Sequence, residues 1–144
     1  MDNEYISINM RYFGQAFIYL LAGTTLFLLR GVFEIPVTSE SISLIWLFGF
    51  VTSMIFGVTN IMVPSYARRI PFNVNTIKIE ISLLNIAIIL LGVAMNVYQL
   101  KILFAPAVLA LLLSMVIHTY NLMTVGFRPK RGPEEKEITT TYSR

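Results

Sequence analysis

The sequence contains no cysteine and only one histidine, His118, among its 144 residues. The absence of cysteine excludes disulfide bonds, thiolate metal sites and thiol catalysis within this chain. A single histidine excludes a bis-histidine haem site built by this chain alone. No nucleophile–base pair, metal-ligand cluster or phosphate-binding loop is visible. We therefore expect neither intrinsic catalysis nor a metal site.

Charge is also scarce, whereas apolar side chains are abundant. Charged residues make up 13% of the chain and apolar residues 56%, against about 25% and 45–50% in soluble domains. The apolar residues gather in four tracts, each long enough to cross a hydrocarbon core of about 30 Å as a helix. The sequence predicts an all-α integral membrane four-helix bundle over residues 1–127, with spans at about 12–33, 41–63, 77–97 and 103–125. A short polar tail precedes the first span, and residues 128–144 form an exposed cytoplasmic tail.

The basic residues are distributed unevenly about these spans. Of the 11 Lys and Arg residues, only Arg30 and Lys101 lie at the ends joined by the first and third connections. The others lie before the first span, near the connection between spans two and three, or after span four. The positive-inside rule then places both termini in the cytoplasm of a prokaryotic cell, in a multi-pass plasma-membrane protein. The excess of Lys and Arg over Asp and Glu is explained by the orientation of the spans in the membrane. The expected partners are therefore lipid and other membrane subunits, not nucleic acid.

The second span has a face of small and polar residues. A rotation of about 100° per residue places Trp46, Gly49, Ser53, Gly57 and Asn60 in one sector. The spacing of Gly49, Ser53 and Gly57 permits close approach by another helix.

The other spans repeat this pattern and are expected to turn their small and polar faces inward. The predicted inner residues are Gln15, Tyr19, Ala22, Gly23 and Leu26 in span one, Ser82, Asn85, Ile89, Gly92 and Asn96 in span three, and Ala107, Ala110, Leu111, Ser114, His118 and Asn121 in span four. The candidate helix-packing residues are Gly49, Ser53, Gly57, Asn60, Asn85, Gly92 and Ser114.

Three polar side chains, Gln15, Asn60 and His118, are predicted to form a layer near the inner leaflet. The first interpretation is that they join the helices by hydrogen bonds. The alternative is a proton relay or ligand site centred on His118. Glu80 is predicted to point away from the inner face of span three and to reach the interface beside Lys78, Arg68 or Arg69.

The segment LFGFVTSMIFGVTNIMVPSYARR resembles a motif of haem-copper oxidase subunit I and of NnrS-type membrane proteins. The segments YFGQAFIYLLAGTTLFLL and ISLLNIAIILLGVAMNV are similar to neighbouring spans of those proteins. The haem-ligand histidines of the family fall at or near Ser43 or Leu44 and at Asn60, none of which is histidine. The resemblance therefore implies a small four-helix relative without the haem sites, in which Gly49, Gly57 and Pro64 serve packing.

Together these patterns favour a non-catalytic integral subunit of a larger prokaryotic membrane complex, and the expected complex is a respiratory one of the oxidase type. Such a subunit would provide a scaffold and contact lipid or quinone, with no intrinsic cofactor. The alternative from another class is a small homo-oligomeric transporter or channel with His118 in the pathway. A third interpretation is a haem shared with a partner subunit, with His118 as the cofactor-binding residue.

Overall fold

The computed structural model describes residues 3–67 and 73–125, and these residues are helical apart from short connections. The helices are α1 (Asn3–Phe33), α2 (Ser39–Leu44), α3 (Thr52–Ala67), α4 (Val74–Asn96) and α5 (Phe104–Thr124). A π-helical segment (Ile45–Val51) joins α2 to α3 into one second span, and a 3₁₀ segment (Tyr98–Leu103) precedes α5. The predicted all-α class and four spans are confirmed. The predicted tail at residues 128–144 lies outside the described residues.

Local signals fix where the spans begin. The Thr38 hydroxyl accepts a hydrogen bond from the backbone N–H of Ser41 at 3.3 Å and so caps α2. Asn73 caps α4 in the same way, through the N–H of Asn75 at 2.9 Å. In contrast to the predicted polar tail, α1 begins at Asn3, and its first turns bury Tyr5 and Asn9. The tail is helical because these side chains continue the packed face of the span.

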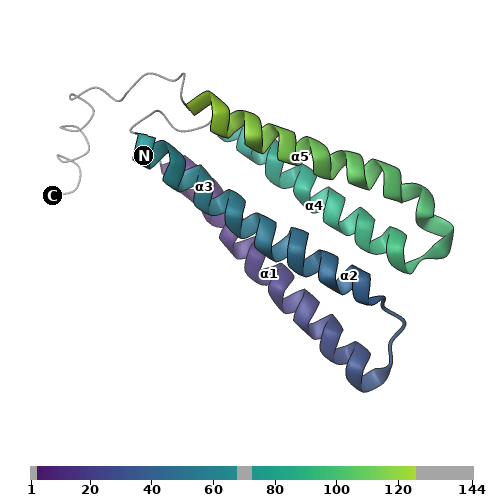
Figure 1. Ribbon diagram of the computed structural model, residues 1–144. Helices are drawn as coiled ribbons and strands as arrows, with labels where there is room; N and C mark the ends of the chain where they lie inside the picture. Colours follow the sequence, from purple (N-terminus) through teal and green to yellow (C-terminus); the bar gives the residue numbers. More distant parts are fainter. Residues whose placement is uncertain (1–2, 68–72, 126–144) are drawn as a thin grey trace, which may run out of the picture.

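The four spans form two antiparallel hairpins (Figure 1). In one hairpin α1 packs along the second span, and in the other α4 packs along α5. We call the end that carries Asn3, Ala67, Val74 and Thr124 the terminal end, and the opposite end the loop end. The hairpins converge at the terminal end and diverge toward the loop end (Figure 1).

Close contact between α1 and the second span depends on glycine. A Cβ atom at Gly49 would lie 2.5 Å from Cγ of Tyr19, and one at Gly57 would lie 2.9 Å from Cβ of Tyr12. Both distances are too short for carbon atoms, so a larger residue would force the helices apart. The Gly49-Ser53-Gly57 face therefore allows tyrosine side chains of α1 to lie directly on the backbone of the second span.

The α4–α5 hairpin agrees with the sequence prediction in α5 and differs from it in α4. The buried residues of α5 are the six that were predicted, namely Ala107, Ala110, Leu111, Ser114, His118 and Asn121. The buried residues of α4 are instead Ile77, Glu80, Leu84, Ala87, Ile88, Leu91 and Ala94, whereas Ser82, Ile89 and Asn96 are exposed. Ser82 needs no partner helix, because its hydroxyl donates to the carbonyl of Lys78 in its own helix at 2.8 Å.

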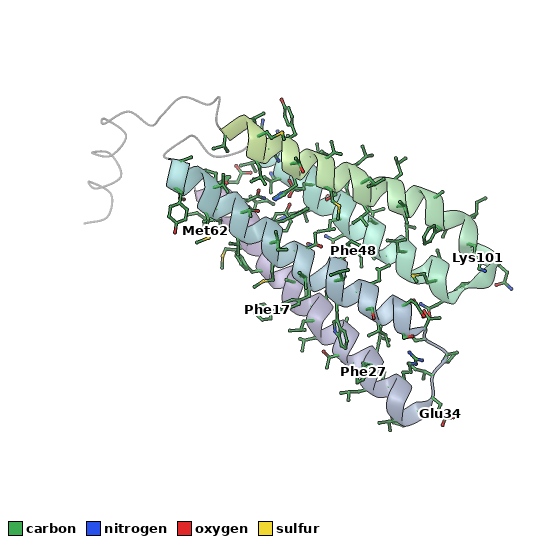
Figure 2. All side chains as sticks on the ribbon, viewed as in Figure 1. Phe17, Phe27, Glu34, Phe48, Met62 and Lys101 are labelled. Carbon is green, nitrogen blue, oxygen red and sulfur yellow. The ribbon has the colours of Figure 1, made fainter. Side chains whose placement is uncertain are left out.

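Large apolar side chains cover the outside of the hairpins. Figure 2 shows Phe17 and Met62 pointing away from the bundle, and both are exposed. In water such a surface would be unfavourable, whereas hydrocarbon accommodates it. The exposed apolar surface and the span lengths together fit a membrane protein.

Candidate functional site

A buried carboxyl group lies between the two hairpins toward the terminal end. Glu80, in the second turn of α4, is 0% exposed, and among the described residues it is the only Asp, Glu, Lys or Arg that is buried. Its Oε1 accepts a hydrogen bond from the Tyr12 hydroxyl of α1 at 2.5 Å and lies 3.0 Å from Nδ1 of His118 in α5. Its Oε2 accepts from the Asn121 amide at 3.2 Å. The prediction that Glu80 reaches outward to the interface is therefore wrong.

The physical reason for this correction is the number of partners that the inward position provides. Three donors on two other helices surround the carboxyl group, and the Ser114 hydroxyl donates to the Glu80 backbone carbonyl at 3.1 Å. Hydrogen bonds from donors favour a buried carboxylate that would otherwise be strongly disfavoured in an apolar medium. At the terminal end, Lys78 instead pairs with the exposed Glu4 at 2.9 Å.

His118 is held on three sides. Its Nδ1 faces Glu80, and its Nε2 lies 3.0 Å from the Thr59 hydroxyl oxygen of α3. The imidazole ring also stacks on the Phe56 ring, with centroids 3.8 Å apart and planes 8° from parallel. His118 therefore connects α5 to α3 as well as to α4.

The surroundings of His118 offer a hydrogen-bond acceptor to each ring nitrogen. The Thr59 hydroxyl has one proton, which it donates to the Ile55 carbonyl at 2.7 Å, so it presents lone pairs to Nε2. Glu80 likewise presents an acceptor to Nδ1. Both ring nitrogens can therefore act as donors in this arrangement.

A second polar cluster lies farther from the terminal end than Glu80 and contains no acidic, basic or histidine side chain. The Gln15 amide donates to the Ser53 hydroxyl at 2.8 Å, and the Asn85 amide donates to Gln15 Oε1 at 2.9 Å. The Tyr19 hydroxyl completes the cluster by donating to Asn85 Oδ1 at 2.5 Å. These bonds connect α1, α3 and α4 without any ionisable pair.

A third polar cluster joins the hairpins near the loop end. Asn96 donates to the Ser41 hydroxyl at 2.8 Å and accepts from the Thr38 backbone N–H at 3.1 Å. The Thr38 and Ser41 hydroxyls are themselves 2.7 Å apart. This cluster also lacks acidic, basic and histidine side chains, so among the three clusters described only the one around Glu80 contains them.

The structure brings some predicted site residues together and separates others. Gly49, Ser53, Gly57 and Asn60 are buried on the second span, Ser114 and His118 are buried on α5, and Asn85 is half-buried in the neutral cluster. Gly92 has no heavy atom within 4 Å of a Cβ built upon it, so it mediates no close approach among the described residues. Of the predicted layer, His118 belongs to the Glu80 cluster, Gln15 belongs to the neutral cluster, and Asn60 lies on α3 nearer the terminal end.

Glu80 and Tyr12 are the functional candidates that the sequence prediction missed. A signal for Glu80 was present in the short connection at Tyr98–Leu103. In a tight antiparallel hairpin, residues equally far from the turn lie opposite each other, which pairs Leu91 with Ala107, Leu84 with Ser114 and Glu80 with His118. For Tyr12 we find no comparable signal, because its partner lies on a helix that is distant in sequence.

A haem does not fit the residues that the resemblance would assign to it. Asn60 stands at one of the ligand positions, and an amide is not a haem-iron ligand of the usual kind. His118 has both ring nitrogens within 3.0 Å of protein atoms, so iron binding would break its contact with Glu80 or with Thr59. We therefore derive no function through haem bound to this chain.

No protein-family model, curated protein or solved structure matches the chain. Its class consequently follows from the fold and the site. The described residues form a four-helix bundle of the membrane-spanning type, with one ionisable cluster among its helices.

Proposed function

We propose that the protein is a small membrane transporter or channel in which Glu80 and His118 take up and release a proton. The observation that carries the proposal is the fully buried Glu80 carboxyl group with its Tyr12, His118 and Asn121 donors. Ionisable side chains inside a membrane bundle are unfavourable and are typical of ion and proton pathways. In this bundle the two neutral clusters already join the helices, so helix packing alone gives no reason for an ion pair.

The chemistry of the pair suits proton transfer. The 3.0 Å separation of His118 Nδ1 and Glu80 Oε1 permits a proton to move between them, which neutralises both groups at once. Uptake of one further proton by the ion pair leaves neutral Glu80 beside charged His118. Loss of one proton leaves charged Glu80 beside neutral His118. The cluster therefore changes its net charge by one unit with each proton that it gains or loses.

Orientation adds a direction to this proposal. If the basic residues place the termini in the cytoplasm of a prokaryotic cell, Glu80 lies in the half of the plasma membrane nearer the cytoplasm. Proton exchange would then occur with the cytoplasmic side first. Assembly of several copies would supply a pathway toward the other side.

The experiment is proton flux into liposomes that contain the purified protein, driven by a potassium diffusion potential and read with an internal pH dye. We expect flux that is lost in both His118→Ala and Glu80→Gln. Ser53→Ala, which alters only the neutral cluster, should retain flux. Flux that is equal in the native protein and in both site variants, each still helical, would contradict the proposal.

A second candidate is a non-catalytic subunit that provides a scaffold within a larger prokaryotic respiratory complex, in contact with lipid or quinone. The specific observation that favours it is the poor coverage of α1. Only 11% of the apolar window of this span is buried inside the bundle, against 22–39% for the others. A neighbouring subunit would cover this face. Isolation in mild detergent distinguishes the candidates, since a scaffold subunit should co-purify with other membrane subunits and a free monomer would count against it.

A further inference from the structure

Two buried amide side chains lie beyond the Glu80 cluster, toward the terminal end. Asn9 of α1 and Asn60 of α3 are both 0% exposed. Asn9 Oδ1, Asn60 Oδ1 and Asn60 Nδ2 have no hydrogen-bond partner among the described residues. Polar atoms buried in this way are strongly disfavoured unless they bind something that supplies the missing hydrogen bonds.

The register of the hairpin places these two amides opposite each other. Along the α1 contact with the second span, Gly23 meets Trp46, Tyr19 meets Gly49, and Tyr12 meets Gly57. Asn9 lies three residues before Tyr12, and Asn60 lies three residues after Gly57. The same antiparallel register therefore continues to Asn9 and Asn60.

Tyr5 ties both residues to one location. Its hydroxyl donates to the Asn60 backbone carbonyl, and its own backbone carbonyl accepts from the Asn9 amide at 2.8 Å. The second bond uses the amide nitrogen of Asn9 and fixes the orientation of its amide group. The Asn9 Oδ1 is then the acceptor that has no partner. The two side chains thus contribute two acceptor oxygens and one amide NH₂ group to the contact between α1 and α3.

We infer that this location is a binding site for an ordered water molecule, which relays protons between the terminal end and Glu80. A water molecule donates two hydrogen bonds and accepts others, so it matches two amide oxygens and one amide N–H. Three hydrogen bonds are also the usual number for a buried water. The inference rests on the proposed function in one respect only, because the relay has a purpose only if Glu80 and His118 exchange protons.

Tyr12 connects the water site to the carboxyl group. It lies one turn from Asn9 on the same buried face of α1, it packs against Gly57, which is one turn before Asn60, and its hydroxyl donates to Glu80 at 2.5 Å. As a proton reaches the water, the water passes one of its own protons to the Tyr12 oxygen, and the Tyr12 hydroxyl proton moves to Glu80 Oε1. The water and Tyr12 are neutral afterward, and Glu80 has gained one proton.

Other charged and titratable groups around this route are few. Tyr12 faces Glu80 from α1, His118 faces it from α5, and α3 contributes only the neutral Phe56 and Thr59 beside His118. Toward the terminal end the exposed Glu4 and Lys78 pair with each other, and Arg11, next to Tyr12 in α1, is also exposed.

The test uses solid-state NMR of the protein in lipid, with two separate readouts. Water-edited spectra of the native protein should show transfer from water to the Asn60 side-chain amide. Proton exchange at the His118 ring nitrogens should become slower by about tenfold or more in Asn60→Leu and in Asn9→Leu. Asn85→Leu removes an amide from the neutral cluster and serves as the matched control, with unchanged exchange at His118.

The two readouts separate failure of this inference from failure of the proposed function. A native Asn60 amide without water transfer overturns the water site, whatever His118 does. Water transfer with exchange rates that are unchanged in both variants overturns the relay. Proton flux that is equal in the native protein, in His118→Ala and in Glu80→Gln contradicts the proposed function, while the water contact at Asn60 is still decided by the first readout.

Discussion

At the scale of single residues, the pairing of Glu80 with His118 has the largest energetic consequence. Each group is buried, and each supplies the opposite partner that the other needs. Removal of one partner from a buried pair leaves an uncompensated charge and typically destabilises a protein by about 3–5 kcal/mol. Stability should therefore depend on keeping both residues or replacing both.

The first prediction concerns a double-mutant cycle at this pair. His118→Leu should lower the free energy of unfolding by about 3–5 kcal/mol, because Glu80 then lacks its charged partner. Adding Glu80→Gln should recover most of that loss, since no unpaired charge remains. Reversible unfolding in mixed detergent micelles measures both values, and Ser53→Ala should cost only about 1 kcal/mol. Losses of the single variants His118→Leu and Glu80→Gln that simply add in the double variant would show that the pair is not coupled.

The same pair shows how far residue-level prediction could reach. The sequence indicated that His118 lies in a buried polar layer, and the structure places it among buried polar groups. It misplaced Glu80 because Ser82, Asn85 and Gly92 made another face of α4 look like the packing face. A serine that bonds to its own helix and a glycine without neighbours carry no packing information, as Ser82 and Gly92 show.

At the scale of the element, the second span contains an irregularity that its composition does not reveal. Between α2 and α3 the backbone is π-helical over Ile45–Val51, and the Thr52 hydroxyl donates to the Leu47 carbonyl five residues earlier at 3.1 Å. Ser41, before this segment, contacts Asn96 of α4, and Ser53, after it, contacts Gln15 of α1. Propensities for α- and π-helix do not differ enough between side chains to predict this from sequence.

The second prediction tests the contact between this span and α1. Gly49→Ala should lower the free energy of unfolding by about 1–3 kcal/mol, because its Cβ would lie 2.5 Å from Cγ of Tyr19. The Tyr19 ring is held by its hydrogen bond to Asn85, so it has little freedom to move.

Gly92→Ala is the control for this measurement. No heavy atom lies within 4 Å of its Cβ position, so the change should be neutral or stabilising by up to about 1 kcal/mol. The sequence treats Gly49 and Gly92 alike as packing residues, and only the structure predicts opposite results. Similar losses in both variants would contradict the described packing of α1 on the second span.

At the scale of the whole molecule, three polar clusters follow one another from the terminal end to the loop end and join the two hairpins. Lipid and leucine are equally apolar, so hydrogen bonds and close packing hold membrane helices together. Four spans, their approximate limits and the inward face of α5 could be predicted, because length, hydropathy and small-residue spacing determine them. The pairing of polar groups across hairpins could not, because it depends on contacts between residues 38–70 positions apart, as in Gln15 with Ser53 and with Asn85.

The third prediction concerns orientation, and the absence of cysteine makes it simple to test. Tyr66→Cys near the terminal end and Ile102→Cys at the loop end place single thiols at positions that are 80% and 81% exposed. In intact cells a membrane-impermeant maleimide should label only Ile102→Cys, and cell lysis should expose Tyr66→Cys. Labelling of both variants in intact cells would contradict the predicted topology.

The place of Glu80 in the chain also has a consequence for how the protein is made. During synthesis α4 leaves the ribosome while α5 is still unfinished, and His118 follows Glu80 by 38 residues. Tyr12 has already been translated and can receive the carboxyl group first. The last span to be inserted thus brings the imidazole that completes the cluster, so a nascent chain that stops before α5 should be held at the insertion machinery or be degraded.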